Sequence, residues 1–335
     1  MRCPSRLREL VESASVIADT PEFPRALLYR VSDQLKVTPM GQALRIGVVS
    51  DGKAGHLNQS LGLAEALRRL RPEIQVQQIP AMARGAALRA LLRRDSQGAA
   101  VDLLIGAGHG THLTLLALGR ACACPTVVIM RPSLPRRLFD LCIVPRHDGV
   151  AEDERCWLSD GPMNRLIPGE KHDEGVILVG GPSPHFIWDE DAVLTQLQAI
   201  AAQGRWQLST SRRTPASFSG AARSLSLPNL TIHDVAELPS GWLGTTLAQA
   251  SQCWVTPDSA SMVYEAMTAG CGVGLMDLAP EKGSRVAGAM ADLQQRGLVT
   301  HFREFAPGST LQPAQPVLAE AKRLAQRLLA SRWLA

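Results

Sequence analysis

Short apolar runs that alternate with amphipathic stretches constrain the fold of this chain more than any other feature. From residue 45 onward the runs are RIGVVS, IQVQQI, VDLLIGAG, PTVVIM and LCIVP, and helical patterns at residues 57–70, 86–94 and 111–120 separate the first four. Apolar strands that alternate with helices are typical of a parallel sheet covered on both faces. The pattern predicts one doubly wound α/β domain over residues 40–165.

The alternation stops in a polar stretch and then resumes. Residues 146–175, RHDGVAEDERCWLSDGPMNRLIPGEKHDEG, contain Pro and Gly without clear periodicity, and we interpret them as a linker or hinge. The later runs are GVILVGGPS, WQLSTS, LTIHD, CWVTP and CGVGLM, with helical patterns at residues 190–202, 245–250, 260–269 and 282–296.

These patterns predict a second doubly wound domain over residues 170–310. A C-terminal helix in residues 311–335 carries one apolar face and is expected to dock, whereas residues 1–39 form an N-terminal extension without recognisable chemistry. Two Rossmann-like α/β domains place a ligand in the cleft between the carboxyl ends of their sheets.

Composition limits the class of function. The chain has 335 residues, of which 45% are apolar and 4% aromatic, and a formal net charge of +4, so nucleic-acid binding is not favoured. Seven scattered cysteines form no CxxC pair, which argues against a metal site or a disulfide framework. No stretch approaches the roughly 20 apolar residues of a membrane span, and the N-terminus lacks the pattern of a signal peptide. We expect a cytoplasmic protein with no metal, no cofactor and no nucleic-acid partner.

The stretch SDGKAGHLNQSLGLAEAL, residues 50–67, follows the first strand directly and allows two interpretations. Gly47, Gly52 and Lys53 are spaced as in the phosphate loop of NTPases. However, Ala54 stands where that loop needs a hydroxyl for magnesium, and Gly47 lies inside the strand, so an NTPase is disfavoured.

In the second interpretation, Gly52 and Gly55 let backbone amides approach a ligand at the start of a helix. His56 then lies at the mouth of the cleft, where an imidazole can take a proton from an acceptor hydroxyl. The alternative is a plain helix start with a loop histidine. The polar residues that accompany His56 are Lys53, Asn58, Gln59 and Ser60.

The segment VTPDSASMVYEA repeats this logic in the second domain. After the strand, Ser259 and Ser261 supply hydroxyls and the first helical turn supplies amides for a diphosphate. Glu265 lies about one turn further along, where a carboxylate can accept both hydroxyls of a ribose. A capped helix with a solvated glutamate is the alternative. The candidate contacts of this segment are Asp258, Ser259, Ser261, Met262 and Glu265.

Other strand ends carry glycines and polar side chains. A double arginine after a strand suits phosphate binding, although turn formation and surface exposure are the competing explanations. His112 is expected on the surface of its helix. The remaining candidate ligand contacts are Gly108, His109, Arg131, Gly180, Gly181, Ser183, Ser211, Arg212, Arg213 and Thr214.

Six motifs occur in a characteristic order: SDGKAGHLNQSLGLAEAL, PRHD, GPMNRL, VGGPS, TSRRTP and VTPDSASMVYEA. Together, over residues 45–310, they resemble the Elm-type mitochondrial fission family, which is glycosyltransferase-like and has many bacterial members. The layout is also similar to GT-B glycosyltransferases such as the peptidoglycan N-acetylglucosamine transferase. There a glycine-rich loop with a histidine opens the acceptor domain, and a helix-start glutamate holds the donor ribose, which implies these roles for His56 and Glu265. The loop departs from a run of bare glycines, because Lys53 adds a charge.

The resemblance implies a metal-independent GT-B glycosyltransferase. A nucleotide-diphosphate sugar would lie on the second domain, and a cell-envelope acceptor, lipid-linked by resemblance, on the first. His56 would be the base, with Asp51 in reserve. The basic stretch ARGAALRALLRR, residues 83–94, either rests on an anionic membrane or packs in the core. Two alternatives remain open: a non-catalytic scaffold on a membrane surface, and a sugar-nucleotide epimerase.

Overall fold

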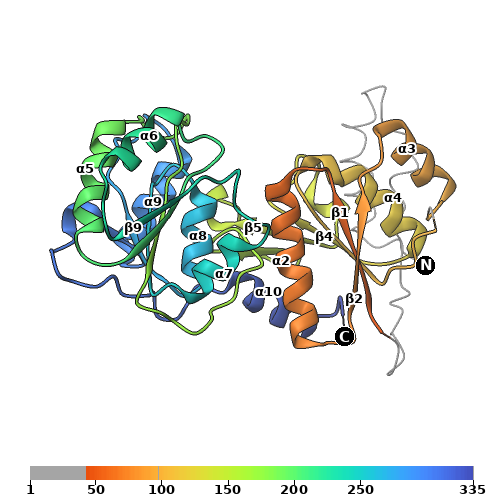
Figure 1. Ribbon diagram of the computed structural model, residues 1–335. Coiled ribbons are helices and arrows are strands. Elements are labelled where there is room, and N and C mark those ends of the chain that lie inside the picture. The colour runs from red at the N-terminus through yellow and green to blue at the C-terminus, as the bar shows by residue number, and fades with distance from the viewer. Residues whose placement is uncertain (1–42, 97, 335) are drawn as a thin grey trace. The chain divides into compact units, whose positions relative to one another are not determined.

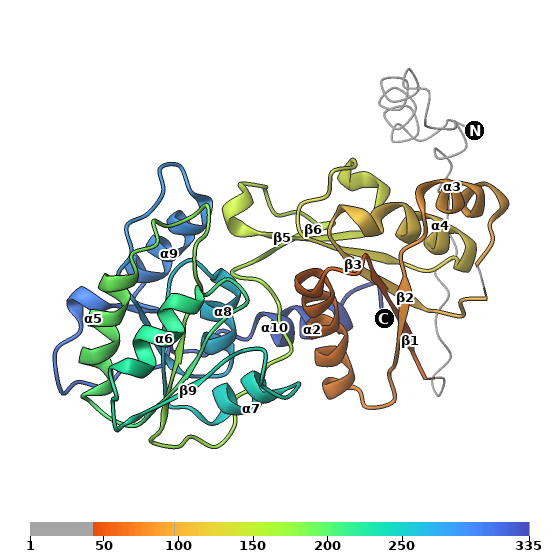
Figure 2. The same ribbon diagram turned by 45° about the horizontal axis from the view of Figure 1, so that its top comes forward.

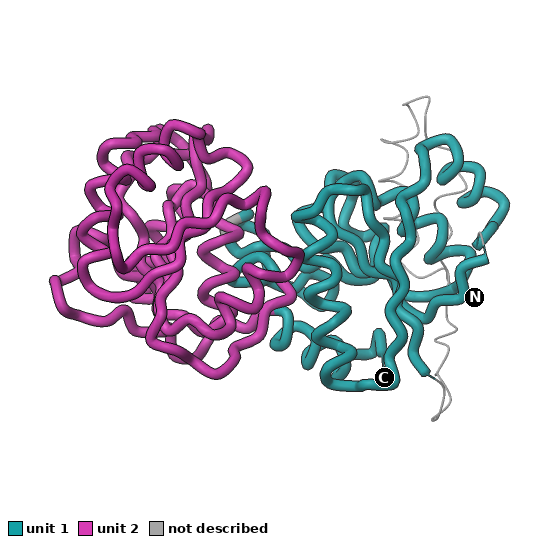
Figure 3. Tube along the Cα trace, in the orientation of Figure 1, with its two compact units in different colours: residues 1–163, 321–335 teal, residues 164–320 magenta. Residues whose placement is uncertain are grey.

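The computed structural model describes residues 43–96 and 98–334, and the chain forms two compact units (Figure 3). Unit 1 comprises the described residues up to 163 together with 321–334, and unit 2 comprises residues 164–320. The predicted extension, residues 1–39, lies outside the described residues.

Unit 1 is built on a parallel sheet with the strand order β2-β1-β3-β4-β5-β6. This order reverses direction between β1 and β3, so the topological switch point of the sheet lies between these two strands. The strands are β1 (Arg45–Ser50), β2 (Gln75–Pro80), β3 (Leu103–Ala107), β4 (Thr126–Ile129), β5 (Leu141–Pro145) and β6 (Cys156–Ser159).

Helices cover both faces of this sheet, as the apolar strands predict. Val48, Ile105 and Val127 pack on the side of α2 and α10, whereas alternate strand residues such as Leu104 and Val128 pack on the side of α3 and α4. Figures 1 and 2 show α10 close to α2 and α3 beside α4. The helices are α2 (Ala54–Leu70), α3 (Arg84–Arg93), α4 (His112–Cys122) and α10 (Glu320–Leu329).

Unit 2 is built on a second parallel sheet, with the order β12-β11-β10-β7-β8-β9. Read from β9, this is the Rossmann order 3-2-1-4-5-6, and its switch point lies between β7 and β10. The strands are β7 (Gly175–Leu178), β8 (Trp206–Ser209), β9 (Leu230–His233), β10 (Gln252–Val255), β11 (Gly272–Leu275) and β12 (Thr300–His301). The helices are α5 (Glu190–Ala201), α6 (Ala216–Ser224), α7 (Trp242–Gln249), α8 (Ala260–Thr268) and α9 (Arg285–Gln295).

The prediction of two doubly wound Rossmann-like units is confirmed, with local corrections. The stretch interpreted as a linker contains β6, which pairs with β5 through Ile143 and Trp157. Helix α6 was not predicted, because its sequence ASFSGAARS contains one Gly and three Ser, and its buried Phe218 and Ala222 overcome that low propensity. Helix α2 begins at Ala54, three residues earlier than expected. None of the described helices is long and apolar enough to cross a membrane.

Candidate functional site

Most of the predicted residues lie in loops at the carboxyl ends of the strands at or next to each switch point. In unit 1 these are the loops after β1 and β3, and in unit 2 they are the loops after β7, β8 and β10. Crevices at these positions are where open α/β sheets bind their ligands. Each unit therefore presents its own cluster of candidate residues, here named the first half-site in unit 1 and the second half-site in unit 2.

The first half-site contains a hydrogen-bonded pair of Asp51 and His56. Asp51 Oδ2 lies 2.9 Å from His56 Nδ1, and Asp51 Oδ1 accepts a hydrogen bond of 3.2 Å from the Lys53 amide. Since α2 begins at Ala54, His56 belongs to the first turn of that helix and not to the preceding loop. Burial acts to raise the pKa of the Asp51 carboxyl, but the hydrogen bond from His56, the Lys53 amide and the nearby positive charge together hold it below its ordinary value.

Gly108, at the end of β3, lies directly behind the His56 ring. A Cβ at this position would come within 2.3 Å of the imidazole, and the backbone has a φ of +78°, which only glycine adopts readily. The hydroxyl of Thr111 donates a hydrogen bond of 2.8 Å to the Gly108 carbonyl and fixes the turn. The loops after β1 and β3 thus hold the imidazole in one position.

Most of the other candidates of unit 1 occupy exposed or half-buried positions. Lys53, Gly55 and His109 are exposed, and Arg131 is an exposed side chain that donates to the Asp148 carbonyl at 3.4 Å. The prediction that His112 lies on the helix surface is wrong. Its ring is buried 5.3 Å from that of Phe139, and burial, reinforced by the charge of His109, lowers its pKa to about 4. Half-buried positions on α2 hold Asn58 and Gln59.

In the second half-site, Asp258 joins loops from three strands. Its side chain is 1% exposed, and Oδ2 accepts from Arg213 Nη2 at 2.6 Å and from the Gly181 amide at 3.2 Å. A Cβ on Gly180 would lie 2.1 Å from the same oxygen, so the carboxylate requires a glycine there. Within the described chain, Asp258 Oδ1 is buried and has no hydrogen-bond partner.

Most of the TSRRTP loop serves local structure. Ser211 donates to the Gly180 carbonyl at 2.7 Å, and Thr214 donates to the Val179 carbonyl at 2.9 Å. Arg213 Nη1 donates to the Gly181 carbonyl at 3.0 Å. These side chains were predicted to contact phosphate, whereas in the structure they connect the loop after β8 to the loop after β7. Arg212 is exposed.

Helix α8 begins at the switch point without a side-chain cap. Its N-cap residue, Ser259, accepts no hydrogen bond from the first turn among the described residues, and its hydroxyl lies 3.4 Å from that of Ser261. Two other helices of the unit are capped in the ordinary way, by Asp189 on α5 and by Ser284 on α9. The first-turn amides of α8 therefore retain the capacity to bind an anion.

One face of α8 presents the remaining candidates. Ser261 and Glu265 are one helical turn apart, so they share a face of the helix with Met262. Ser261 is exposed, and Met262 and Glu265 are half-buried, whereas the neighbouring Val263 and Tyr264 are buried. In the loop after β7, Ser183 is half-buried and accepts from the His185 amide at 3.2 Å. The candidate residues of this segment thus lie on one face of α8, whereas their roles stay a prediction.

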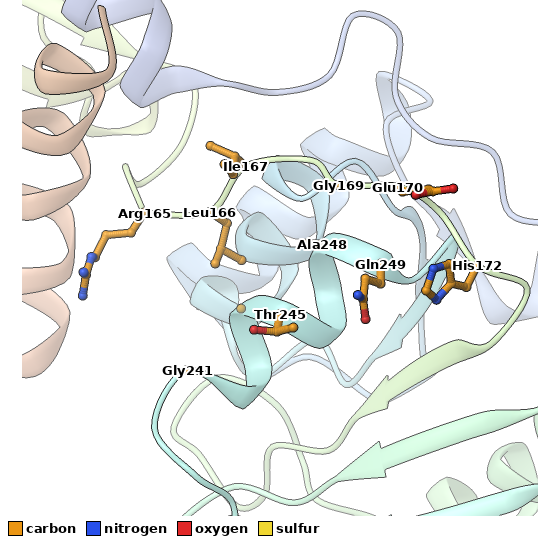
Figure 4. Close-up of a pocket in the computed structure, with 11 residues that line it drawn as sticks. Arg165, Leu166, Ile167, Gly169, Glu170, His172, Gly241, Thr245, Ala248 and Gln249 are labelled. Atoms are coloured by element: carbon orange, nitrogen blue, oxygen red, sulfur yellow. The ribbon is translucent and has the colours of Figure 1, made fainter. Parts of the chain in front are cut away.

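A cavity of about 490 Å³ lies at the opposite end of this sheet (Figure 4). Residues of the segment 165–172 and of helix α7 line it, and among them the Gly169 amide donates to the Ala248 carbonyl at 3.0 Å. This segment leads into the amino end of β7, and α7 leads into the amino end of β10. None of the predicted site residues lines the cavity, so it is separate from the second half-site.

No local sequence pattern marks Lys171 as a residue that connects two helices. Its Nζ donates to the Ala269 carbonyl at 2.6 Å and to the Leu247 carbonyl at 3.3 Å, at the C-terminal ends of α8 and α7. Burial lowers the pKa of this amine. A contact between segments so distant in sequence leaves no local pattern. Within residues 43–96 and 98–334, no group of three or more His, Cys, Asp or Glu side chains is placed to hold a metal ion.

Comparisons with known proteins give the following matches. Residues 54–332 match the sequence family described as mitochondrial fission ELM1. No curated protein matches the chain. A solved structure from Listeria monocytogenes, described as a UDP-N-acetylglucosamine 2-epimerase, is similar with a TM-score of 0.53 at 12% identity, over 86% of this chain and 95% of that one. MurG of Acinetobacter baumannii is similar with a TM-score of 0.45 at 16% identity, over 87% and 92%. At these identities the likeness concerns the fold alone.

Proposed function

The chain belongs to the mitochondrial fission ELM1 family, and we propose that it is a GT-B glycosyltransferase that uses a nucleotide-diphosphate sugar. Unit 2 holds the donor and unit 1 holds the acceptor. The observation that carries the proposal is the start of α8, which lies at the switch point of a Rossmann-ordered sheet and lacks a side-chain cap.

The donor diphosphate binds at the first turn of α8. Its oxygens accept from the helix amides and from the hydroxyls of Ser259 and Ser261, while Glu265 accepts from the ribose hydroxyls. When the sugar leaves, negative charge grows on the diphosphate. Fixed amide dipoles at this position stabilise that charge more in the transition state than in the ground state, which lowers the barrier without a metal ion.

The acceptor is activated by His56. Because Asp51 is held ionised and contacts Nδ1, the imidazole donates through Nδ1 and keeps the lone pair of Nε2 free to accept a proton from the acceptor hydroxyl. A carboxyl with a lowered pKa is a weak base, so Asp51 orients the imidazole and stabilises the imidazolium, and is not the reserve base that the sequence suggested. The acceptor itself, by family resemblance, is a lipid-linked sugar of the cell envelope.

Isothermal titration of the full chain with UDP, dTDP and GDP, and then with their sugars, tests the donor assignment. We expect one nucleotide to bind and Glu265→Ala to weaken it at least about tenfold, the loss of a bidentate charged hydrogen bond. Asp292→Ala is the matched control, since this exposed acid on α9 pairs only with Arg296 in the described chain. An unchanged affinity in Glu265→Ala contradicts the ribose contact.

Product analysis with the binding nucleotide-sugar separates the alternatives. Transfer requires an acceptor and is expected to fall at least about a hundredfold in His56→Ala, the typical contribution of a general base. Conversion of the sugar without any acceptor identifies an epimerase. Failure of all nucleotides and nucleotide-sugars to bind identifies a non-catalytic scaffold.

A further inference from the structure

Helix α3 has two faces of different chemistry. Ala87, Ala90 and Leu91 are buried, and Ala90 and Leu91 belong to the apolar cluster that the helix shares with α4. The buried face of α3 therefore agrees with the alternative that this stretch packs in the core. Figure 1 shows α3 beside α4 at the periphery of unit 1.

The opposite face of α3 carries basic side chains around one exposed apolar side chain. At 100° per residue, Leu92 and Arg89 point away from the buried face and Arg93 flanks Arg89, whereas Arg84 projects on the side of Leu91, at the edge of the buried face. Leu92 is 50% exposed, and all these arginines are exposed, as is Arg94 at the end of the helix. No acidic residue occurs between Arg84 and Arg94.

The arginines of α3 form no ion pair with the acids of the described chain. Within the described part of the chain, no ion pair joins any of Arg84, Arg89, Arg93 or Arg94 to an acidic side chain, whereas exposed arginines such as Arg296 pair with neighbouring acids. Four positive charges on one short segment repel one another, and no ion pair within the described chain neutralises them. An external anionic surface would supply that compensation.

We infer that the outward face of α3 docks on an anionic lipid bilayer. The guanidinium groups meet lipid phosphates, and the Leu92 side chain enters the headgroup region, with the helix axis parallel to the membrane plane. Leu92 favours a bilayer over nucleic acid, because an apolar side chain at the centre of the face has no partner on a phosphate backbone. The inference does not depend on the proposed chemistry.

The expected binding is weak and dependent on salt. Each arginine near an anionic membrane contributes about fivefold in affinity, the equivalent of about 1 kcal/mol. The helix is fixed to its own unit through the buried face, so only Leu92 reaches the apolar region, and its burial adds a comparable factor. Electrostatic attraction should therefore dominate, and high salt should release the protein.

Co-sedimentation of the full chain with phosphatidylcholine vesicles, with and without phosphatidylglycerol, tests this inference. We expect binding only to the anionic vesicles at low salt, reduced at least about twentyfold in Arg89→Glu/Arg93→Glu. The matched control is Arg205→Glu/Arg296→Glu, which makes the same change in net charge on exposed positions of unit 2. It should bind the vesicles as the unchanged protein does.

Leu92→Ala keeps every charge and is expected to weaken vesicle binding about threefold. Equal losses in the two double variants, or equal binding to both kinds of vesicle, would overturn the inference. The inference would also be overturned if the protein bound duplex DNA more tightly than anionic vesicles and if Arg89→Glu/Arg93→Glu weakened only the binding of DNA. A circular dichroism melt that matches that of the unchanged protein shows that the variant remains folded.

Discussion

The pair of Arg213 and Asp258 yields the most quantitative prediction, because its two members differ in burial. The Asp258 side chain is 1% exposed, and the Arg213 side chain is 41% exposed. If Arg213 is changed to Met, the carboxylate stays buried with only the Gly181 amide as donor, and its Oδ1 already lacks a partner in the described chain. If Asp258 is changed to Asn, Arg213 can turn to solvent.

Removing one member of a fully buried ion pair costs about 3–5 kcal/mol, because the other charge is left uncompensated. Arg213 is partly solvated, so the lower end of this range applies, and we expect Arg213→Met to reduce the free energy of unfolding by about 3 kcal/mol. Asn keeps the shape of Asp and can accept from the Gly181 amide and from Arg213. Asp258→Asn should therefore cost only about 1 kcal/mol.

Urea unfolding followed by tryptophan fluorescence measures both costs. The signal reports mainly on unit 2, which contains four of the six tryptophans, namely Trp188, Trp206, Trp242 and Trp254. Equal costs in the two variants would refute the argument from burial. A cost below about 0.5 kcal/mol for Arg213→Met would show that the pair contributes no more than an ordinary surface contact.

Two further predictions concern unit 1. Gly108→Ala should displace the His56 ring and reduce the rate of sugar transfer. Gly149→Ala is the control, because Gly149 also has a positive φ but an added Cβ there meets nothing within 4 Å. Equal losses of transfer in the two variants would contradict this prediction. His112 should make stability depend on pH. The unfolded chain binds a proton below about pH 6.5 and the folded chain only below about 4, so the free energy of unfolding should fall by about 3 kcal/mol as the pH drops across this range. Urea titrations should show a smaller fall in His112→Gln, and an unchanged pH profile would refute this origin.

Much of the fold follows from the periodicity of the sequence, and the failures have physical reasons. Most of the predicted strands are apolar runs flanked by helices, as in a sheet buried on both faces. Strand β6 is as long as the predicted β4, but its sequence CWLS lies in a stretch rich in polar residues, Pro and Gly, which was interpreted as a linker. Strand β12 has two residues, which is too short for a period to be recognised. The start of α2 was placed too late, because its N-cap, Lys53, has no side-chain acceptor and carries none of the usual capping signals.

The position of the candidate site was more predictable than the roles of its residues. Polar residues at strand ends must gather at one edge of a parallel sheet, so their location follows from the alternation alone. Which of them meet depends on strand order. Arg213 follows β8 and Asp258 follows β10, and both reach the loop after β7 only because β7 lies between those strands. That order is absent from the sequence pattern, so the ion pair of Arg213 and Asp258 could not be predicted from it.

The affinity of Ser259→Asp for UDP, or for whichever nucleoside diphosphate the unchanged protein binds, tests the central claim most directly. Aspartate is a preferred N-cap and complements the helix dipole, so the variant should unfold with an equal or higher free energy. Its charge also occupies the position assigned to the diphosphate. We expect titration calorimetry to show at least about tenfold weaker binding in a protein that is no less stable. An affinity equal to that of the unchanged protein would contradict a diphosphate at the start of α8.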